Sequence, residues 1–146
     1  MKTALVFVGA LLPILSIAAE KIHYEPCGNS QLLGRQSIIQ VTPDPPKAGE
    51  SISIVVTVVL DTLVAGGTST LSSSVGALSL ADHFNLCEIA ASGGDRCPLQ
   101  PGRHHFKLVH NVPALAANQR LDFKFDAKTD DSRMLFCFSG YADVVQ

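Results

Sequence analysis

The chain contains no tryptophan, only two tyrosines and seven phenylalanines, and 16% charged residues among its 146 positions. An antibody-type domain places a core tryptophan between its paired cysteines, so that variant of the immunoglobulin fold is excluded. The eleven basic and thirteen acidic residues are scattered along the chain. A nucleic-acid-binding protein shows a basic stripe, and a membrane clamp shows a polybasic cluster. Neither pattern is present, so we expect no nucleic acid partner.

The usual signatures of catalysis and metal binding are also missing. There is no Cys-x-x-Cys and no Gly-x-Ser-x-Gly sequence, and the spacing of cysteine and histidine does not supply a zinc site. The pairs Gly66-Gly67 and Gly93-Gly94 indicate turns, not phosphate loops, and Asp130-Asp131 indicates a hairpin tip. We therefore expect no enzymatic activity, no metal and no cofactor.

The first 18 residues read as a secretory signal peptide. Lys2 precedes an apolar run over residues 4–15, and small residues surround a cleavage position after Ala18. Removing this segment leaves a single domain over residues 19–146, with ten basic and thirteen acidic side chains. The most apolar later run, residues 52–60, is too short to cross a bilayer. We expect a soluble protein of the secretory pathway, either extracellular or in the lumen of a vacuole or lysosome-like compartment.

The mature segment is dominated by alternation of apolar and polar residues. In the clearest case, residues 51–61 place an apolar side chain at every second position: Ile52, Ile54, Val56, Val58 and Leu60. This period of two predicts a strand with one fully buried face. Similar patterns predict further strands over residues 36–42, 68–78, 82–89, 105–112, 121–127 and 134–139.

About seven strands separated by turn residues predict an all-β fold, an immunoglobulin-like sandwich of two antiparallel sheets. No segment has a convincing helical period. The four cysteines, in an oxidising compartment, predict two disulfides with three possible connectivities. Cys87 and Cys97 flank a short loop that closes easily, whereas Cys27 and Cys137 lie near the first and last strands. The spacing favours Cys87–Cys97 and Cys27–Cys137.

An ordered series of short motifs resembles the ML (lipid-recognition) domain family, and within it the fungal phosphatidylglycerol/phosphatidylinositol transfer proteins. The series spans nearly the whole mature chain. Its members are Pro43–Gly49 before the long strand, Phe84–Cys87, Cys97–Gly102, Val112-Pro113 and Leu135–Phe138. The resemblance implies the same two disulfides and two sheets that splay apart, so that lipid tails insert between them.

The resemblance implies a phospholipid or sterol as the ligand, held in a cavity between the sheets. We expect a monomer that touches membranes transiently, with the mouth of the cavity rimmed by Ile89, Pro98, Leu99 and Pro101 beside the Cys87–Cys97 bridge. The inward faces of the strands give the candidate lining: Ile54, Val56, Val58, Leu71, Val75, Phe84, Phe106, Leu108, Phe123, Phe125, Phe136 and Phe138.

Two alternatives stay open at the level of sequence. Apolar residues that line a cavity look the same as residues that fill a core, so a secreted recognition or adhesion sandwich with a filled core and no lipid fits the same pattern. His110 lies on the apolar side of its strand with Phe106 and Leu108. A histidine there, or at His83, would make ligand release depend on pH.

Overall fold

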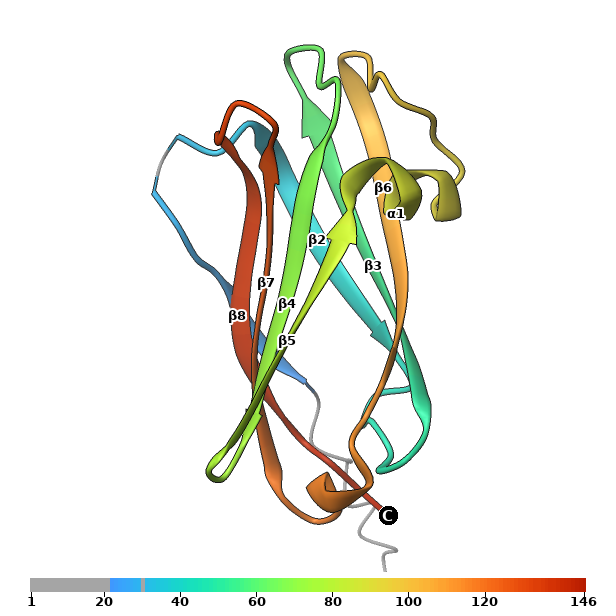
Figure 1. Cartoon of the computed structure of the whole chain (residues 1–146), viewed down its shortest axis with the longest axis vertical. Coiled ribbons are helices and arrows are strands. Elements are labelled where there is room, and N and C mark those ends of the chain that lie inside the picture. Colours follow the sequence, from blue (N-terminus) through green and yellow to red (C-terminus); the bar gives the residue numbers. More distant parts are fainter. Residues whose placement is uncertain (1–21, 30) are drawn as a thin grey trace, which may run out of the picture.

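The computed structural model describes residues 22–29 and 31–146, so the expected signal peptide lies outside the described residues. Two antiparallel sheets face each other (Figure 1). The larger sheet has the order β1-β8-β7-β4-β5, and the smaller has the order β2-β3-β6. The strands are β1 (His23–Pro26), β2 (Gly34–Thr42), β3 (Ser51–Leu60), β4 (Gly67–Val75), β5 (Leu78–Asn85), β6 (Gly102–Asn111), β7 (Arg120–Thr129) and β8 (Met134–Asp143).

The alternation in the sequence fixes which face of each strand is buried. Along β3, every second residue from Ile52 to Leu60 is buried, and the residues between them are exposed or half-buried. The central strand β3 pairs over its whole length with β6, from Ser51 opposite Asn111 to Leu60 opposite Gly102. The predicted all-β sandwich is therefore confirmed.

The segment from residue 68 to residue 92 differs from the prediction. The first strand ends at Val75, a turn at Gly76 with a φ of 56° reverses the chain, and β5 begins at Leu78. The expected strand over residues 82–89 ends at Asn85, because α1 (Leu86–Ser92) follows. The short strand β1 was not predicted either, since its four residues are all exposed and carry no alternation.

The helix α1 has a local cause. Asn85 is its N-cap, and the side-chain oxygen accepts hydrogen bonds from the backbone N–H groups of Cys87 (2.9 Å) and Glu88 (3.3 Å). Glu88 lies in the first turn, where the helix dipole favours an acidic side chain. Ala90 and Ala91 follow, and alanine is the strongest helix former. The expected flexible loop between Cys87 and Cys97 is therefore largely helical.

Both predicted disulfides are confirmed, Cys27–Cys137 and Cys87–Cys97. The first ties the segment after β1 to β8, and the backbone N–H of Cys27 also donates to the Cys137 carbonyl at 2.9 Å. The second ties α1 to the segment before β6. The first bridge therefore joins a connecting segment to a strand of the sandwich, and the second joins two connecting segments.

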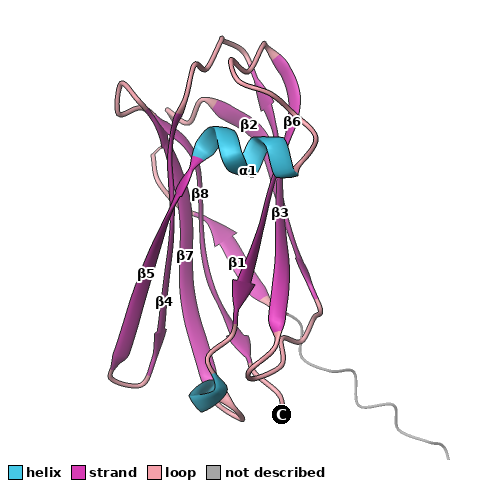
Figure 2. Cartoon of the chain, turned by 45° about the vertical axis from the view of Figure 1, so that its right-hand side comes forward, coloured by secondary structure: helices cyan, strands magenta, loops and turns pink. Residues whose placement is uncertain are grey.

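The two ends of the sandwich are built differently (Figure 2). We call one the helix half, which carries α1, and the other the hairpin half, which carries the β4–β5 turn and the short helix η1 (Ala114–Ala116). In the helix half, Leu86, Ile89 and Leu99 are buried, and Leu99 forms a two-hydrogen-bond bridge with Val64. These side chains close that end.

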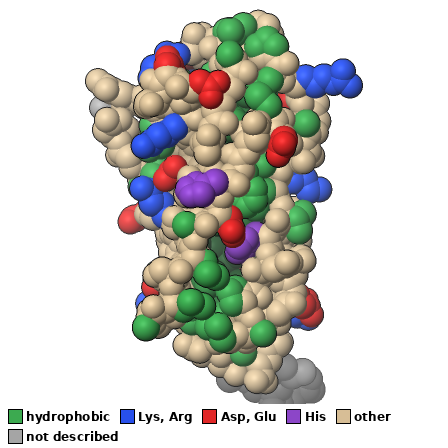
Figure 3. Space-filling view, viewed as in Figure 1, with side chains coloured by type: hydrophobic (Ala, Val, Ile, Leu, Met, Phe, Trp, Pro, Cys, Tyr) green, Lys and Arg blue, Asp and Glu red, His purple; other side chains and the backbone are tan. Residues whose placement is uncertain are grey.

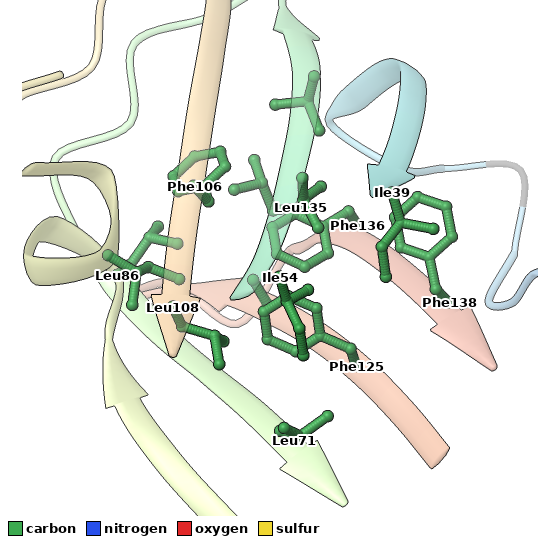
Figure 4. Packing of buried hydrophobic residues seen from close by; sticks show 14 of the residues in the cluster. Ile39, Ile54, Leu71, Leu86, Phe106, Leu108, Phe125, Leu135, Phe136 and Phe138 are labelled. Atoms are coloured by element: carbon green, nitrogen blue, oxygen red, sulfur yellow. The ribbon is translucent and has the colours of Figure 1, made fainter. Parts of the chain in front are cut away.

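Aromatic rings fill the middle of the core (Figure 4). The Phe136 ring lies 5.6 Å from that of Phe106 and 5.2 Å from that of Phe125, centroid to centroid, and 6.3 Å from that of Phe138. All four are at most 1% exposed. The rings come from both sheets, so they hold the sheets together. Among the described residues, no helix is long and apolar enough to cross a membrane.

Candidate functional site

A small apolar cavity lies between the sheets in the hairpin half. We call it the slot, and its volume is about 30 Å³. Its lining is apolar apart from two side chains, those of Ser73 and His110. The lining residues are Ile22, Ile39, Val41, Pro46, Ile52, Ile54, Leu71, Ser73, His110, Leu121, Phe123, Phe125 and Ala142.

The sandwich is open along one side of the hairpin half because five strands face only three. The register of β4 and β5 pairs Leu71 with Asp82 and Ser73 with Leu80. Cross-strand partners share a face of the sheet, so Asp82 and Leu80 belong to the inward face of β5. No strand of the smaller sheet covers them, and no residue of β5 is buried. This leaves the inward face of β5 as a half-exposed lip beside the slot.

One contact between a histidine and a carboxylate spans this open side. His110 is on β6, the edge strand of the smaller sheet, and Asp82 is on β5, the edge strand of the larger sheet. Their Nδ1 and Oδ2 atoms lie 3.3 Å apart, with the His110 side chain 14% exposed and the Asp82 side chain 51% exposed. The other ring nitrogen of His110, Nε2, is buried without a hydrogen-bond partner. Figure 3 shows a histidine beside an acidic side chain at a hollow in this face, with hydrophobic side chains gathered below.

The structure brings only part of the predicted lining together at the slot. Four of the twelve candidates line it: Ile54, Leu71, Phe123 and Phe125. Phe84 is half-buried on β5 and packs against the core. The others are buried in the same core but outside the slot: Val56, Val58, Val75, Phe106, Leu108, Phe136 and Phe138. Contact of any of the twelve with a ligand stays a prediction.

Several lining residues were missed by the sequence prediction. Ile52 and Leu121 lie on alternating apolar faces, but nothing in the pattern separates them from residues that only pack. Ile39 and Val41, on β2, and Ala142, on β8, belong to the same group. What these residues share is their level along the sandwich, since all lie toward the strand ends that meet in the hairpin half. Only the pairing of the strands reveals this level.

The residues expected to rim the mouth of the cavity do not lie beside the slot. Ile89 and Leu99 are 4% and 0% exposed and close the helix half, and neither they nor Pro98 nor Pro101 line the slot. The reason is α1, which folds the predicted loop onto the core. The open side of the sandwich is instead bordered by β5 and β6.

Metal-binding geometry is not found among residues 22–29 and 31–146. No group of three or more His, Cys, Asp or Glu side chains in these ranges is placed to hold a metal ion. One carboxyl group in them has a clearly shifted pKa. The Thr129 hydroxyl donates to Asp131, and this hydrogen bond, followed by Arg133, lowers the pKa of Asp131 from its ordinary value of 3.8. Asp131 lies in the β7–β8 turn, far along the strands from the slot.

Comparison with known families bears directly on this fold. A family model described as the ML domain matches residues 21–144. The chain belongs to the ML domain family. A curated ML-type relative from Cryptococcus neoformans var. neoformans serotype D, called a phosphatidylglycerol/phosphatidylinositol transfer protein, is 24% identical over 127 residues. The match covers 84% of this chain and 71% of the relative.

Solved structures share the fold of this ML domain. A Niemann-Pick type C2 protein from the Japanese carpenter ant superposes with a TM-score of 0.58 at 16% identity, covering 84% of this chain and 98% of that one. Chicken MD-1, crystallised with lipid IVa, gives 0.56 at 12% identity, covering 84% of this chain and 88% of that one. At these identities the likeness establishes the fold.

Proposed function

We propose that this ML domain is a lipid-binding and transfer protein that holds one phospholipid or sterol between its two sheets. The observation that carries the proposal is the slot, an apolar space between the sheets beside an uncovered strand edge, in a chain of this family. The curated relative is a phospholipid transfer protein by name, and chicken MD-1 was crystallised with a lipid. Both support a lipid over any other guest.

The hydrophobic effect is sufficient to drive such binding. Each buried CH₂ group contributes about 0.8 kcal/mol, so a tail of about sixteen carbons gains on the order of 12 kcal/mol before the costs of opening and ordering. No polar contact is required for this gain. A binding site built in this way leaves no catalytic motif in the sequence, which agrees with the lack of one here.

Binding requires the sheets to separate. The slot holds about 30 Å³, roughly the space of one water molecule, whereas sites for drug-sized ligands measure about 300–1,000 Å³. The boundary between β5 and β6, which lies beside the slot, is one place where the sheets can separate, because no backbone hydrogen bonds join these two edge strands. The guest therefore replaces part of the core instead of filling a preformed tunnel.

The same end of the molecule offers a surface for transient membrane contact. Residues 71–81 and 111–119 contain no charged side chain, and they form the β4–β5 hairpin and the η1 segment. Both segments lie at one end of the sandwich (Figures 1 and 2). Leu78, Leu80 and Leu115 are 39%, 42% and 52% exposed there. A monomer that presents this end to a bilayer exchanges its guest without crossing water, and the two disulfides fit an extracellular or lumenal compartment.

Extraction of the purified protein tests the proposal directly. Organic solvent followed by mass spectrometry should recover phospholipid or sterol in a ratio approaching one per chain. A second assay should detect transfer of a fluorescent phospholipid or sterol from donor to acceptor vesicles. Absence of co-purified lipid together with absence of transfer contradicts the proposal.

A second candidate function is favoured by the small size of the slot. A sandwich whose core is nearly filled serves equally well as a secreted recognition module that binds another molecule through its surface. The two functions differ in the same extraction experiment. The recognition module would yield no lipid and would take up neither fluorescent sterol nor fluorescent phospholipid.

A further inference from the structure

The imidazole of His110 stands out among the residues that line the slot. The other lining side chains are apolar except for Ser73, and none of them titrates. A buried polar atom without a partner costs free energy, and native structures keep few of them. His110 Nε2 is such an atom, and it belongs to a residue that lines the slot. This argues that a guest supplies the missing partner.

Asp82 determines which kind of partner fits. In a neutral imidazole one ring nitrogen carries the hydrogen and the other accepts a hydrogen bond. The Asp82 carboxylate lies 3.3 Å from Nδ1, so we assign the hydrogen to Nδ1, where it faces the negative charge. Nε2 is then an acceptor. A hydroxyl group satisfies it, whereas an ether or ester oxygen cannot, because neither carries a hydrogen to donate.

We propose that His110 is the specificity-determining residue of the slot: its Nε2 accepts a hydrogen bond from a hydroxyl group of the bound lipid, and Asp82 is the positioning residue that orients the ring. This inference rests on the proposed function and names one chemical feature of the guest. The hydroxyl belongs either to a sterol or to the polar head group of a phospholipid. The position of the pair at the open side places that hydroxyl at the boundary between slot and solvent.

Pairs of guests that differ only in the hydroxyl test the inference, in a buffer at about pH 8. One pair is a fluorescent sterol and its methyl ether. The other is pyrene-labelled phosphatidylglycerol and pyrene-labelled phosphatidylmethanol, which carries the same charge without the glycerol hydroxyls. We expect about tenfold tighter binding of the hydroxyl form in one pair, the effect of one hydrogen bond to a buried acceptor. The pair that shows it identifies the source of the hydroxyl.

Three variants separate specificity from packing. His110→Phe keeps an aromatic ring but removes both nitrogens, so the ratio of affinities for the hydroxyl form and the form without it should fall to about one. Asp82→Asn weakens the orientation of the ring, so the preference should fall partway. His105→Phe is the matched control, because His105 lies on the same strand and bonds to Thr57 at 2.9 Å on the solvent side. It should keep the preference of the wild type.

The ratio of the two dissociation constants within each pair of guests measures specificity, even where a variant changes the affinity for both guests. His110→Gln adds a check, since its amide oxygen is an acceptor and should retain part of the preference. Equal binding of both members of both pairs by the wild type overturns this inference and leaves the proposed function standing. A preference that survives in His110→Phe also overturns it. Failure of the wild type to bind any of the four probes overturns both.

Discussion

In the helix half of the sandwich Leu86 and Leu99 are both 0% exposed, whereas in the hairpin half the inward face of β5 is uncovered. Both halves have the same alternating strands. The helix half adds α1 and the Cys87–Cys97 bridge, which close its end. The hairpin half has the slot and the His110–Asp82 contact across its open side. The helix half is thus closed, and the hairpin half is open on one side.

Removing the Cys27–Cys137 bridge should give the largest effect on stability. Its cysteines are 110 residues apart, and closing a loop of that size stabilises by about 4–5 kcal/mol in the chain-entropy model. The Cys87–Cys97 bridge spans 10 residues and should contribute about 3 kcal/mol. Denaturant unfolding of the two double Cys→Ala variants measures both values. The reverse order would show that native strain or residual unfolded structure outweighs loop length.

Phe136→Ala should destabilise the protein by about 4 kcal/mol, because it leaves a cavity in the middle of the core among three other phenylalanines. Phe123→Ala is the control in the hairpin half, where Phe123 is only half-buried and lines the slot. It should cost clearly less in unfolding free energy. Equal costs measured by urea denaturation would contradict the distinction between the filled middle of the core and the accessible hairpin half.

Ser73→Val should stabilise the protein by about 0.5–1 kcal/mol and reduce lipid transfer. Ser73 is 8% exposed and lines the slot, so a larger apolar side chain that suits a strand fills the space the guest needs. Ser72→Val is the matched control, since the neighbouring side chain points to the other face of the sheet. Thermal unfolding and the vesicle transfer assay measure the two effects. Unchanged transfer in Ser73→Val would argue against the slot as the binding site.

Asp131→Asn should give the smallest effect, limited to the dependence of stability on pH. The pKa of Asp131 is lowered in the folded state by the Thr129 hydroxyl and Arg133, so ionised Asp131 stabilises the fold above its unfolded value of 3.8. This contribution disappears as the pH falls through the folded value. Thermal unfolding should therefore place the variant slightly below the wild type at pH 7 and level with it at about pH 2. Lipid transfer should not change.

Local patterns in the sequence predict the sandwich well. The period of two along β3 and β6 reports burial of one face directly, and the cysteine positions agree with both bridges. The helix α1 was missed, although Asn85 followed by Glu88 three positions later is a helix-start signal. Seven residues are too few for a hydrophobic period to show.

The slot is harder to predict from the sequence, because its lining residues and the His110–Asp82 contact depend on how strands distant in the sequence lie in space. Val56 and Ile54 are equivalent in the sequence pattern, yet only Ile54 lines the slot. What separates them is their level along the sandwich, which depends on where the opposite sheet ends. Asp82 is equally hidden, since its meeting with His110 depends on the two edge strands lying on the same side.

The unequal strand count of the two sheets also suggests how this fold is converted between uses. A fourth strand added beside β6 would lie over β5, turn the half-exposed lip into interior and seal the domain permanently. Conversely, shortening β6 at its Asn111 end would widen the opening beside β5 and leave Phe106 in place. The extent of one edge strand therefore decides whether such a sandwich has an accessible interior or a sealed one.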